Sequence, residues 1–266
     1  MNTFIRVWLL ASVCAAVALC VGCGRRASMI TMAGSTAFQP FAEKLADRYM
    51  AVHKGVNITV QGGGSAAGIQ SAISGAAQIG MADLVTLPAE AKALNAVVVA
   101  RDGIAVVVNP ASTVTNLSID QVRGIFGGTV KNWKDVGGRD GPITVVSREA
   151  GSGTRSSFEQ ILGGIDLSRD AIVQDSNGTI RETVANDANA VGYLSHGLIN
   201  EKIKPVTVDD RACTTDEIMA GTYKLVRPIF LLTKQPPTDT ETAFLAYILS
   251  AEGQGIIQKS GLIPAK

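Results

Sequence analysis

An α/β fold is predicted by three features of the 266-residue sequence. From Ala27 onwards, short β-like runs alternate with segments in which apolar residues recur at helical spacing. Two of the β-like runs, Ala96–Ala100 and Ile104–Asn109, are unbroken apolar stretches rich in β-branched residues, which are typical of strands buried on both faces of a sheet. Glycine-rich loops that contain Ser or Thr connect three of the strands to helices. Together these features indicate helices layered on a sheet.

The first third of the chain predicts two strands, each followed by a helix. Met29–Gly34 and Asn57–Gly62 have the composition of strands. The first helix is marked by apolar residues at helical spacing, namely Phe38, Phe41, Leu45, Tyr49 and Val52. The second helix is expected to start within Gly68–Ser74, where Ile69 and Ile73 are four residues apart.

The alternation continues to the end of the chain without an internal repeat. Ser118 and Gln121 form a capping-box pattern, which predicts a helix that begins at Ser118. Further strands are expected at Ile143–Glu149, Ala190–Ser195, Lys204–Asp209 and Pro228–Thr233. Further helices are expected at Thr154–Leu162, Thr240–Ser250 and Glu252–Lys259.

The charge balance excludes a broad electrostatic attraction for nucleic acid. The chain has 24 Lys and Arg against 23 Asp and Glu, a formal net charge of +1, without a run of like charges. Cys213 is the only cysteine beyond the N-terminal segment, so we expect it to be structural, and no spacing of residues suits a metal. We therefore expect no metal and no cofactor. A bound anion must be held by local dipoles and a few placed charges.

Residues 1–23 have the pattern of an export signal. A short basic start precedes the apolar run Val7–Gly22, which is shorter than the roughly 20 residues of a membrane span. The segment LCVGC is similar to a bacterial lipoprotein signal, in which Cys23 becomes the lipidated first residue, although Cys20 stands where such signals usually have Leu. Ordinary cleavage and an uncleaved anchor are the alternatives.

Three loops between a strand and a helix share one composition. They are AGSTAFQP with Ser35 and Thr36, GGGSAAGI with Ser65, and SREAGSGTRSS with Arg148, Ser152, Gly153 and Thr154. Glycine lets the backbone approach a ligand, the first helical turn has N–H groups without partners, and hydroxyl groups add rotatable donors. Loops of this kind that face one point would form a cage for a tetrahedral oxyanion, to which Arg148 adds a permanent charge.

Asp83, which follows the apolar run QIGMA, is a candidate for selectivity within such a cage. A carboxylate repels an anion unless the anion carries a proton that it can donate. Phosphate is partly protonated near neutral pH, since the second pKa of a phosphate group is about 6, whereas sulfate carries no proton. A buried acceptor can reject a ligand that lacks the matching donor by a factor of about 10⁴–10⁵. If Asp83 lines the site, it selects phosphate over sulfate.

Each of these residues also has a simpler interpretation. Ser or Thr before a helix is most often an N-cap, and an Asp after a strand can cap the next helix. The loops match neither a P-loop nor a dinucleotide fingerprint. An enzyme with Ser152 as nucleophile is a further alternative, but the chain lacks GxSxG and no His has a triad context. Asp102 is expected to be structural, and Asn177 to cap the helix that follows it.

Seven motifs occur in an order that is specific as a set. They are AGSTAFQP, GGGSAAGI, IGMAD, RDGIAVVVNP, IFGGTVKNWKDVGG, SREAGSGTRSSFE and AVGYLS. In this order they resemble the phosphate-binding lipoproteins of bacterial phosphate ABC transporters. The resemblance extends from about Ala33 to the C-terminus, and it implies the type II periplasmic-binding-protein fold, in which two α/β lobes close on a ligand.

The resemblance also implies a set of phosphate-binding residues. The family's ligand positions correspond to Thr36, Ala37, Ser65, Asp83, Arg148, Ser152, Gly153 and Thr154. At Ala37 the contact would be made by the backbone N–H. Some members have an Asp two residues after the ligand Arg, with which it pairs. Ala150 stands there in this chain, and Glu149 is the candidate partner of Arg148.

The family's organisation implies that residues 27–105 and 228–266 form lobe one and residues 106–227 form lobe two. The implied function is that of a solute-binding protein, not an enzyme, which captures inorganic phosphate and delivers it to the permease subunits of an ABC transporter. We expect an exported monomer, in the periplasm or on the outer cell surface, that is tethered to the membrane through Cys23. A binding protein for sulfate or molybdate and a phosphate sensor are the alternatives.

Overall fold

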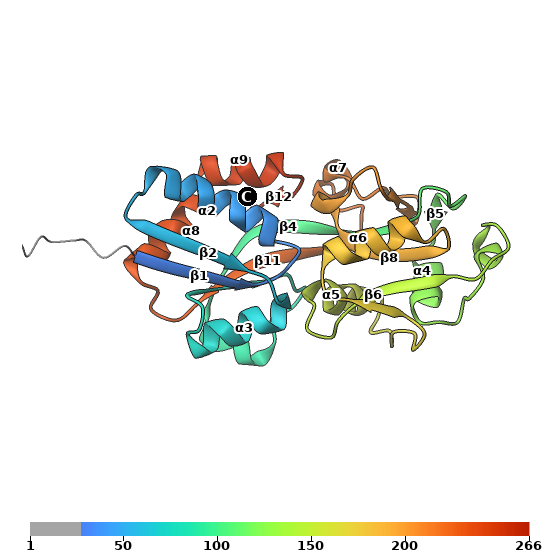
Figure 1. Ribbon diagram of the computed structural model, residues 1–266, viewed down its shortest axis with the longest axis horizontal. Helices are drawn as coiled ribbons and strands as arrows, with labels where there is room; N and C mark the ends of the chain where they lie inside the picture. The colour runs from blue at the N-terminus through green and yellow to red at the C-terminus, as the bar shows by residue number, and fades with distance from the viewer. Residues whose placement is uncertain (1–27, 266) are drawn as a thin grey trace, which may run out of the picture.

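The structure of the protein is a computed structural model that describes residues 28–265. The expected signal segment 1–23 and Cys23 lie outside these residues. Figure 1 shows two lobes side by side along the long axis of the molecule, connected in the middle by the strands β4 (Asn95–Val108) and β11 (Val226–Thr233). This architecture confirms the predicted α/β fold class with two lobes joined by hinge strands.

Lobe one contains the beginning and the end of the described chain. Its elements are β1 (Ser28–Gly34), α2 (Gln39–Val52), β2 (Val56–Gln61), α3 (Gly64–Ser74), β3 (Ile79–Ala82), η1 (Ala89–Ala93), α8 (Asp239–Leu249), α9 (Ala251–Lys259) and β12 (Ile263–Pro264). β2, β1 and β3 are parallel neighbours in the sheet, and β11 joins β3 to β4 by antiparallel pairing. Helices α2, α8 and α9 cover one face of this sheet, and α3 covers the other (Figure 1).

Lobe two is formed by the middle of the chain. Its elements are β5 (Asn116–Leu117), α4 (Ile119–Phe126), η2 (Trp133–Val136), β6 (Thr144–Arg148), α5 (Gly153–Ile161), β7 (Ile172–Gln174), α6 (Asn177–Asn186), β8 (Ala190–Ser195), η3 (His196–Leu198), β9 (Lys204–Pro205), β10 (Thr207–Val208) and α7 (Thr215–Met219). The sheet continues from β4 through β8 and β6 to β7. The sequence did not predict β7, α7 or the short strand β5.

Strand β4 belongs to the sheets of both lobes. Residues 95–103 pair with β11, whereas residues 104–108 pair with β8. Two separate strands were expected here, on either side of the polar segment Arg101–Gly103. That expectation is wrong, because Arg101–Gly103 pairs with Val226–Pro228 of β11 and so continues the backbone ladder across the junction between the lobes.

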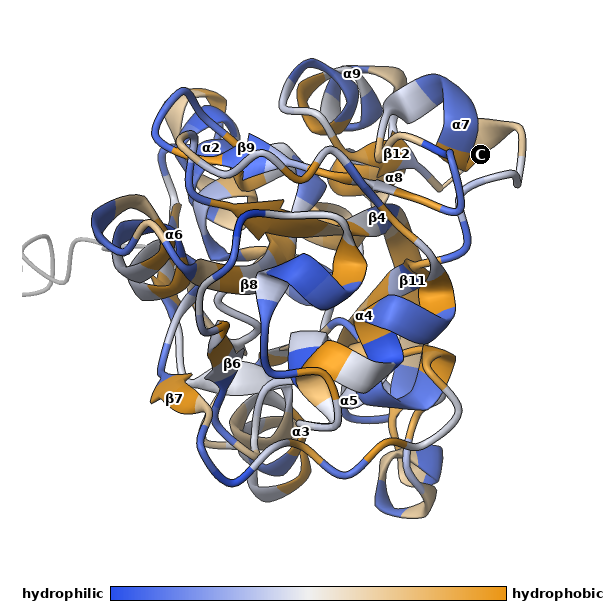
Figure 2. Cartoon of the chain, turned by 90° about the vertical axis from the view of Figure 1, so that its right-hand side faces the viewer, coloured by the Kyte–Doolittle hydropathy of each residue, from blue (hydrophilic) through white to orange (hydrophobic). Residues whose placement is uncertain are grey.

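Buried apolar residues form a separate core in each lobe. The larger cluster of lobe one contains Ala100 and Ile229, and the cluster of lobe two contains Ile104 and Leu225, so the core changes within β4 and near the start of β11. A smaller cluster of lobe one lies under α3. In Figure 2 hydrophobic residues concentrate on the central strands and hydrophilic residues on the outer helices and loops. Within residues 28–265, no helix has both the length and the apolar character that are needed to cross a membrane.

Local sequence signals predicted some element boundaries correctly and others incorrectly. Strand β8 has the predicted bounds, and the capping box at Ser118 is present with both hydrogen bonds. Helix α3 begins at Gly64, four residues before the predicted start. The expected strand Lys204–Asp209 is divided between two partners, because β9 pairs with β4 and β10 pairs with β5. Asp209 has a positive φ of 48°, which ends the strand.

Candidate functional site

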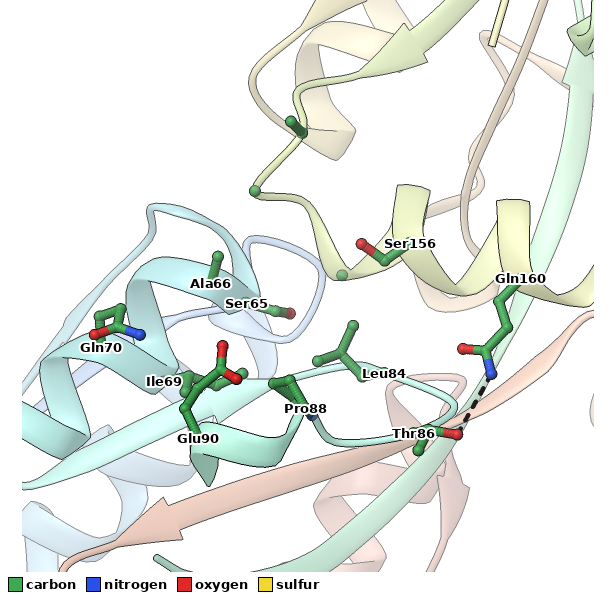
Figure 3. Close-up of a pocket in the computed structure, with 13 residues that line it drawn as sticks. Ser65, Ala66, Ile69, Gln70, Leu84, Thr86, Pro88, Glu90, Ser156 and Gln160 are labelled. Atoms are coloured by element: carbon green, nitrogen blue, oxygen red, sulfur yellow. Dashed lines mark hydrogen bonds between the residues drawn. The ribbon is translucent and has the colours of Figure 1, made fainter. Parts of the chain in front are cut away.

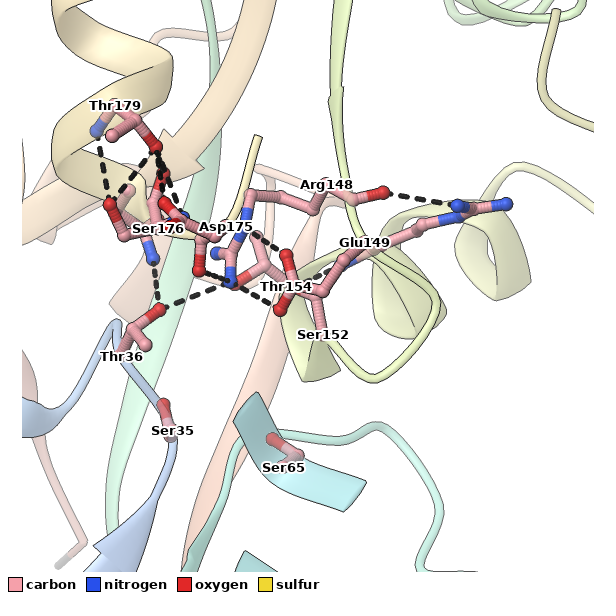
Figure 4. Close-up of polar contacts among 12 residues, drawn as sticks. Ser35, Thr36, Ser65, Arg148, Glu149, Ser152, Thr154, Asp175, Ser176 and Thr179 are labelled. Atoms are coloured by element: carbon pink, nitrogen blue, oxygen red, sulfur yellow. Dashed lines mark hydrogen bonds and ion pairs between the residues drawn. The ribbon is translucent and has the colours of Figure 1, made fainter. Parts of the chain in front are cut away.

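The three glycine- and hydroxyl-containing loops meet at the junction between the lobes. They follow β1, β2 and β6, and the first turns of α3, α5 and α6 point to the same region (Figure 4). β1 and β2 are parallel and bring their two loops to one edge of the lobe-one sheet, whereas β6 runs in the opposite direction and brings its loop to the junction from lobe two. Helix N-termini at the junction supply backbone N–H groups and a dipole that favours an anion.

Contacts through glycine bring α3 close to the ends of β1 and β3. Gly34 has a φ of +136°, and a Cβ there would lie 2.2 Å from the carbonyl oxygen of Met81. At Gly68 on α3 a Cβ would lie 2.6 Å from the same oxygen. A side chain at either position would push the helix away from the sheet. This close packing places Ser65, in the first turn of α3, against Asp83.

Asp83 is a buried acceptor in the middle of the junction, with 1% of its surface exposed. Ser65 Oγ donates to Asp83 Oδ1 over 2.5 Å, and Thr154 Oγ1 donates to Asp83 Oδ2 over 3.2 Å. Arg227 Nη2 lies 2.8 Å from the same Oδ2. A carboxylate has about four acceptor positions, and these three contacts leave one.

Arg148 is held by three different segments of the chain, and 1% of its surface is exposed. Its Nε and Nη2 each donate to a carboxylate oxygen of Glu149 over 2.9 Å, and Nη2 also donates to the carbonyl oxygen of Asp175. Nη2 reaches Thr36 Oγ1 at 3.1 Å, across the junction between the lobes. Glu149 therefore orients Arg148, in agreement with its selection as the candidate partner in a chain that has Ala150 where some relatives have Asp.

The first loop presents Thr36 and Ala37 to the junction. Thr36 Oγ1 accepts from Arg148 and, over 3.4 Å, from Asn177 Nδ2. Ala37 is buried beside it, and Ser35 Oγ accepts from the backbone N–H of Phe38 at the start of α2. Since Thr36 Oγ1 already accepts twice, its hydroxyl proton is the part of the group that can serve a ligand.

Ser152 and Gly153 form the start of helix α5. Ser152 is the N-cap, and its Oγ accepts from the backbone N–H of Arg155. A Cβ at Gly153 would lie 2.1 Å from Ser65 Oγ and 2.5 Å from Asp83 Oδ1. Gly153 therefore permits the contact between lobe two and lobe one. Ser65 and Thr154 meet at Asp83 here, and Arg148 meets Thr36 at a second contact between the lobes, while Ala37 and Ser152 are chain neighbours of Thr36 and Gly153.

The junction is closed in this structure. Ala66 N donates to the carbonyl oxygen of Gly151 over 3.1 Å, and Ser157 Oγ donates to the backbone oxygen of Asp83 over 3.1 Å. Together with the contacts of Thr154 and Arg148, these bonds connect the loops of lobe one to helix α5 and strand β6 of lobe two. A small ligand between the loops would contact both lobes at once.

A cavity of about 270 Å³ lies beside this junction, between α3 and α5 (Figure 3). Ser65 and Gly153 line it, and so do Leu84 and Pro88. Its one ionisable lining residue is the acidic Glu90. Because the lining contains a carboxylate and no basic group, the cavity is unsuited to an anion, which is better matched by the loops around Arg148.

Comparison with known proteins assigns this chain to a family. Residues 23–252 match the family described as PBP superfamily domain. Phosphate-binding protein PstS of Bacillus subtilis (strain 168) is 34% identical over 241 residues, which are 88% of this chain and 80% of that protein. The chain belongs to the PBP superfamily and to the family of PstS proteins.

Solved structures of PstS-like proteins have the same fold. A putative phosphate ABC transporter substrate-binding protein with bound phosphate, from Clostridium perfringens, aligns with a TM-score of 0.88 and 35% identity, over 90% of this chain and 100% of that chain. An ABC-type phosphate transport receptor from Vibrio cholerae aligns with a TM-score of 0.75 and 37% identity, over 88% and 99% of the two chains. Both agree with the two-lobed PBP fold that the motifs imply.

Sequence reasoning missed Arg227, whose side chain is buried next to the predicted PstS-type site. Its Nη2 contacts Asp83 and, over 2.9 Å, Asp102 Oδ2. No motif surrounds Arg227, and it is 125 residues away from Asp102 in the sequence. The structural role expected for Asp102 agrees with this ion pair and with the hydrogen bond that Ser195 Oγ donates to Asp102 Oδ1. Burial raises the pKa of Asp102, while the Arg227 charge and the Ser195 hydroxyl act in the opposite direction.

Two other residues have roles that the sequence assigned differently or not at all. Asn177 was expected to cap α6, but Ser176 is the N-cap. Asn177 instead accepts from the backbone N–H of Ser195 and donates to Thr36, which links β8 to the first loop. Tyr193 accepts from the backbone N–H of Arg148 and shares a hydrogen bond of 2.7 Å with Ser147. Burial raises the pKa of Tyr193 to about 12, so its hydroxyl group remains uncharged at neutral pH.

The His and Cys side chains considered for metal binding or catalysis do not form a functional site among residues 28–265. Within residues 28–265, no group of three or more His, Cys, Asp and Glu side chains is arranged to hold a metal ion. His53 and His196 contact the carbonyl oxygens of Tyr49 and Gly261, so neither serves Ser152 as a base. Cys213 is buried, and burial raises the pKa of its thiol, which fits the structural role expected for it.

Proposed function

We propose that this chain binds inorganic phosphate between its two lobes and presents it to the permease of an ABC transporter. The observation that carries the proposal is the composition of the junction, where donors from both lobes surround the buried carboxylate of Asp83, which has one acceptor position left. Such a site suits an anion that carries a proton of its own. The names of the relatives, which include a structure with bound phosphate, support the same ligand.

The proposed ligand set is Thr36, Ala37, Ser65, Asp83, Arg148, Ser152, Gly153 and Thr154. The hydroxyl protons of Thr36 and Ser152 are available, because their oxygens act as acceptors within the protein. Nη1 of Arg148 has no acceptor among residues 28–265, and it supplies the permanent charge. Backbone N–H groups in the first turns of α3 and α5 add neutral donors.

Calorimetric titration tests the ligand. The purified chain is unfolded and refolded to remove bound anions, and it is titrated at neutral pH with phosphate, sulfate and molybdate in separate experiments. We expect one phosphate per chain and no heat from sulfate. Heat of binding from sulfate or molybdate but not from phosphate would show that the ligand is another oxyanion. Absence of heat with all three anions would refute an oxyanion site.

Substitution of Asp83 tests how the anion is selected. Asn keeps the shape of the side chain and adds N–H donors, so Asp83→Asn should admit sulfate and reduce the discrimination of about 10⁴–10⁵ that a buried acceptor provides. The measurement is the ratio of the two dissociation constants. If sulfate is still rejected by Asp83→Asn, selection through the proton of phosphate is wrong.

Delivery and sensing would use the same binding site, so they must be separated in cells. The names of the relatives as transport receptors and substrate-binding proteins favour delivery. We expect the chain to restore uptake of labelled phosphate in a strain that lacks its own phosphate-binding protein but keeps the permease. Restored phosphate-dependent gene regulation without uptake would support the phosphate sensor instead.

We further propose that the chain is exported and tethered by a lipid on Cys23, with residues 1–23 as its signal. The support is the LCVGC segment. Cys23→Ala should move the protein from the membrane fraction to the soluble exported fraction, whereas an unchanged membrane fraction would contradict the lipid anchor. The proposed lobe limits are 27–105 with 228–266 and 106–227, and the proposed monomer is checked by light scattering.

A further inference from the structure

A buried ion cluster lies behind Asp83 and outside the proposed ligand set. Arg227 has 0% of its surface exposed, and its Nη2 lies 2.8 Å from Asp83 Oδ2 and 2.9 Å from Asp102 Oδ2. Both carboxylates are 1% exposed. One guanidinium group is therefore shared between two carboxylates, and only Asp83 also contacts the ligand loops, through Ser65 and Thr154.

The position of Arg227 is set by the two connecting strands rather than by the ligand loops. Arg227 on β11 lies directly opposite Asp102 on β4 in the antiparallel register. Asp102 is held in turn by the hydroxyl of Ser195 on β8, over 2.9 Å. The backbone pairing at the junction therefore fixes the charged end of Arg227 next to Asp83 before any anion arrives.

The hydrogen bonds of Arg227 do not account for its burial. Its Nε and Nη1 are buried without a hydrogen-bond partner among residues 28–265. Buried N–H groups without partners are unfavourable, so a smaller apolar side chain would satisfy this position better if packing were its only requirement. What Arg227 supplies here is its positive charge, which cannot be lost by deprotonation in a protein.

We infer that Arg227 is a specificity-determining positioning residue, which keeps Asp83 a carboxylate whose last acceptor position faces the bound anion. The inference rests on the proposed function. As a carboxylate, Asp83 can only accept a hydrogen bond, so it requires an anion with an O–H group, such as phosphate. The adjacent guanidinium stabilises this charged form while an anion approaches.

Without the guanidinium, the same site would lose its selectivity for a physical reason. A buried carboxylate next to an arriving anion experiences both burial and like charge, and both favour uptake of a proton from solvent. A protonated Asp has an O–H donor. That donor would complete the cage around sulfate, which needs donors only. Loss of the Arg227 charge should therefore convert a phosphate site into one that accepts both anions.

The test compares the wild-type chain with three variants, purified and stripped as above. Arg227→Met keeps the length of the side chain and removes the charge together with the two unpartnered N–H groups. Because this change leaves two buried carboxylates, the double variant Arg227→Met with Asp102→Asn removes one charge of each sign and guards against misfolding. Arg227→Lys keeps the charge and serves as the matched control.

Each protein is titrated with phosphate and sulfate at one pH, in two buffers that differ in ionisation enthalpy, so that protons taken up on binding are counted. We expect both Met variants to narrow the preference for phosphate by about 100-fold or more, with about one proton taken up per sulfate. Arg227→Lys should restore rejection of sulfate. A residue that only supports the fold would change stability without this proton uptake.

The opposite results are equally clear. A folded Met variant that binds phosphate and still rejects sulfate overturns the inference, and so does one that binds neither anion, because the residue would then determine affinity. Sulfate binding by Arg227→Lys as tight as by Arg227→Met also overturns it, since the charge would not be the cause. Failure of the wild-type chain to bind phosphate refutes the proposed function itself and removes the basis of the inference.

Discussion

The hydroxyl group of Ser152 has a structural role as the N-cap of α5 and a proposed role in phosphate binding. Its oxygen accepts from the backbone N–H of Arg155 and so caps α5. The hydroxyl proton is not used in that bond, so it remains available to a ligand. The two interpretations of Ser152, as an N-cap and as a ligand-binding residue, are therefore compatible with each other.

Addition of a single methyl group at Gly153 should weaken phosphate binding. A Cβ there would lie 2.1 Å from Ser65 Oγ, so Gly153→Ala should hold α5 away from Asp83 and weaken phosphate binding by about 10- to 100-fold, the equivalent of a moderate overpacking. Calorimetry measures the affinity, and circular dichroism checks the fold.

Gly151→Ala is the matched control for this prediction. A Cβ at Gly151 would meet its nearest atom, Ala66 Cβ, at an ordinary 3.7 Å, so affinity should stay within about threefold of wild type. Equal affinities for both alanine variants would contradict the close contact assigned to Gly153.

Local sequence identifies where some helices of this protein begin, although not the starts of α3 and α6. Capping boxes are present at Ser118 of α4 and at Thr238 of α8, each with both reciprocal hydrogen bonds. These bonds join residues three positions apart, so they depend little on the rest of the fold. α8 packs on the outer face of the lobe-one sheet, far from the anion loops (Figure 1).

Thr238→Ala should therefore reduce stability without changing ligand binding. The N-cap oxygen accepts from Glu241 N over 3.3 Å, and its loss should lower the free energy of unfolding by about 1 kcal/mol. Urea denaturation gives this value, with phosphate affinity expected to be unchanged. Thr242→Ala, at an exposed position inside the same helix, should be neutral or slightly stabilising. A loss of equal size at both positions would argue against the cap.

At the scale of the whole molecule, lobe two contains buried groups that resist ionisation. Burial raises the pKa of Tyr193 to about 12 and that of Tyr223 well above 10, and it also raises the pKa of Cys213. In the unfolded chain these groups lose their protons at lower pH. The contribution of the two Tyr side chains to stability is complete below pH 10, the ordinary Tyr value, and is lost as pH rises towards 12, whereas that of the Cys213 thiol starts to be lost near pH 9, its own ordinary value.

We expect the free energy of unfolding to fall between about pH 10 and pH 12, with Trp133 in lobe two as the fluorescent reporter. Tyr193→Phe cannot ionise at this position, so its stability should fall less steeply over the same range, although it loses the bond to Ser147. Parallel curves for the two proteins would mean that Tyr193 does not contribute to the alkaline transition.

Ligand binding should also stabilise the molecule as a whole, because an anion between the lobes contacts both of them. At a free phosphate concentration about 100 times the dissociation constant, the stabilisation is about 2.7 kcal/mol, which corresponds to an increase in Tm of roughly 5–10 °C. Differential scanning calorimetry measures it. Sulfate should cause no increase, and Arg148→Met should abolish the response to phosphate. An equal increase with sulfate would contradict selective closure.

The amino-acid sequence by itself determined the α/β class, the three glycine- and hydroxyl-containing loops and several helix starts. These features depend on short-range chemistry, such as glycine and hydroxyl residues before a helix, a capping box, or apolar residues at helical spacing. Glu149 could be named as the partner of Arg148 because the two residues are neighbours, and the structure has them hydrogen-bonded.

Only the tertiary structure decided how distant residues combine. The sequence divided β4 at a polar segment, because the partner strand that pairs with Arg101–Gly103 comes more than a hundred residues later. For the same reason Arg227 carried no signal, since its contact with Asp83 arises from the register between β11 and β4 and from the packing of both on the strand end that holds Asp83. Local patterns specify which polar groups are present, whereas sheet register and lobe closure determine which of these groups form ion pairs with one another.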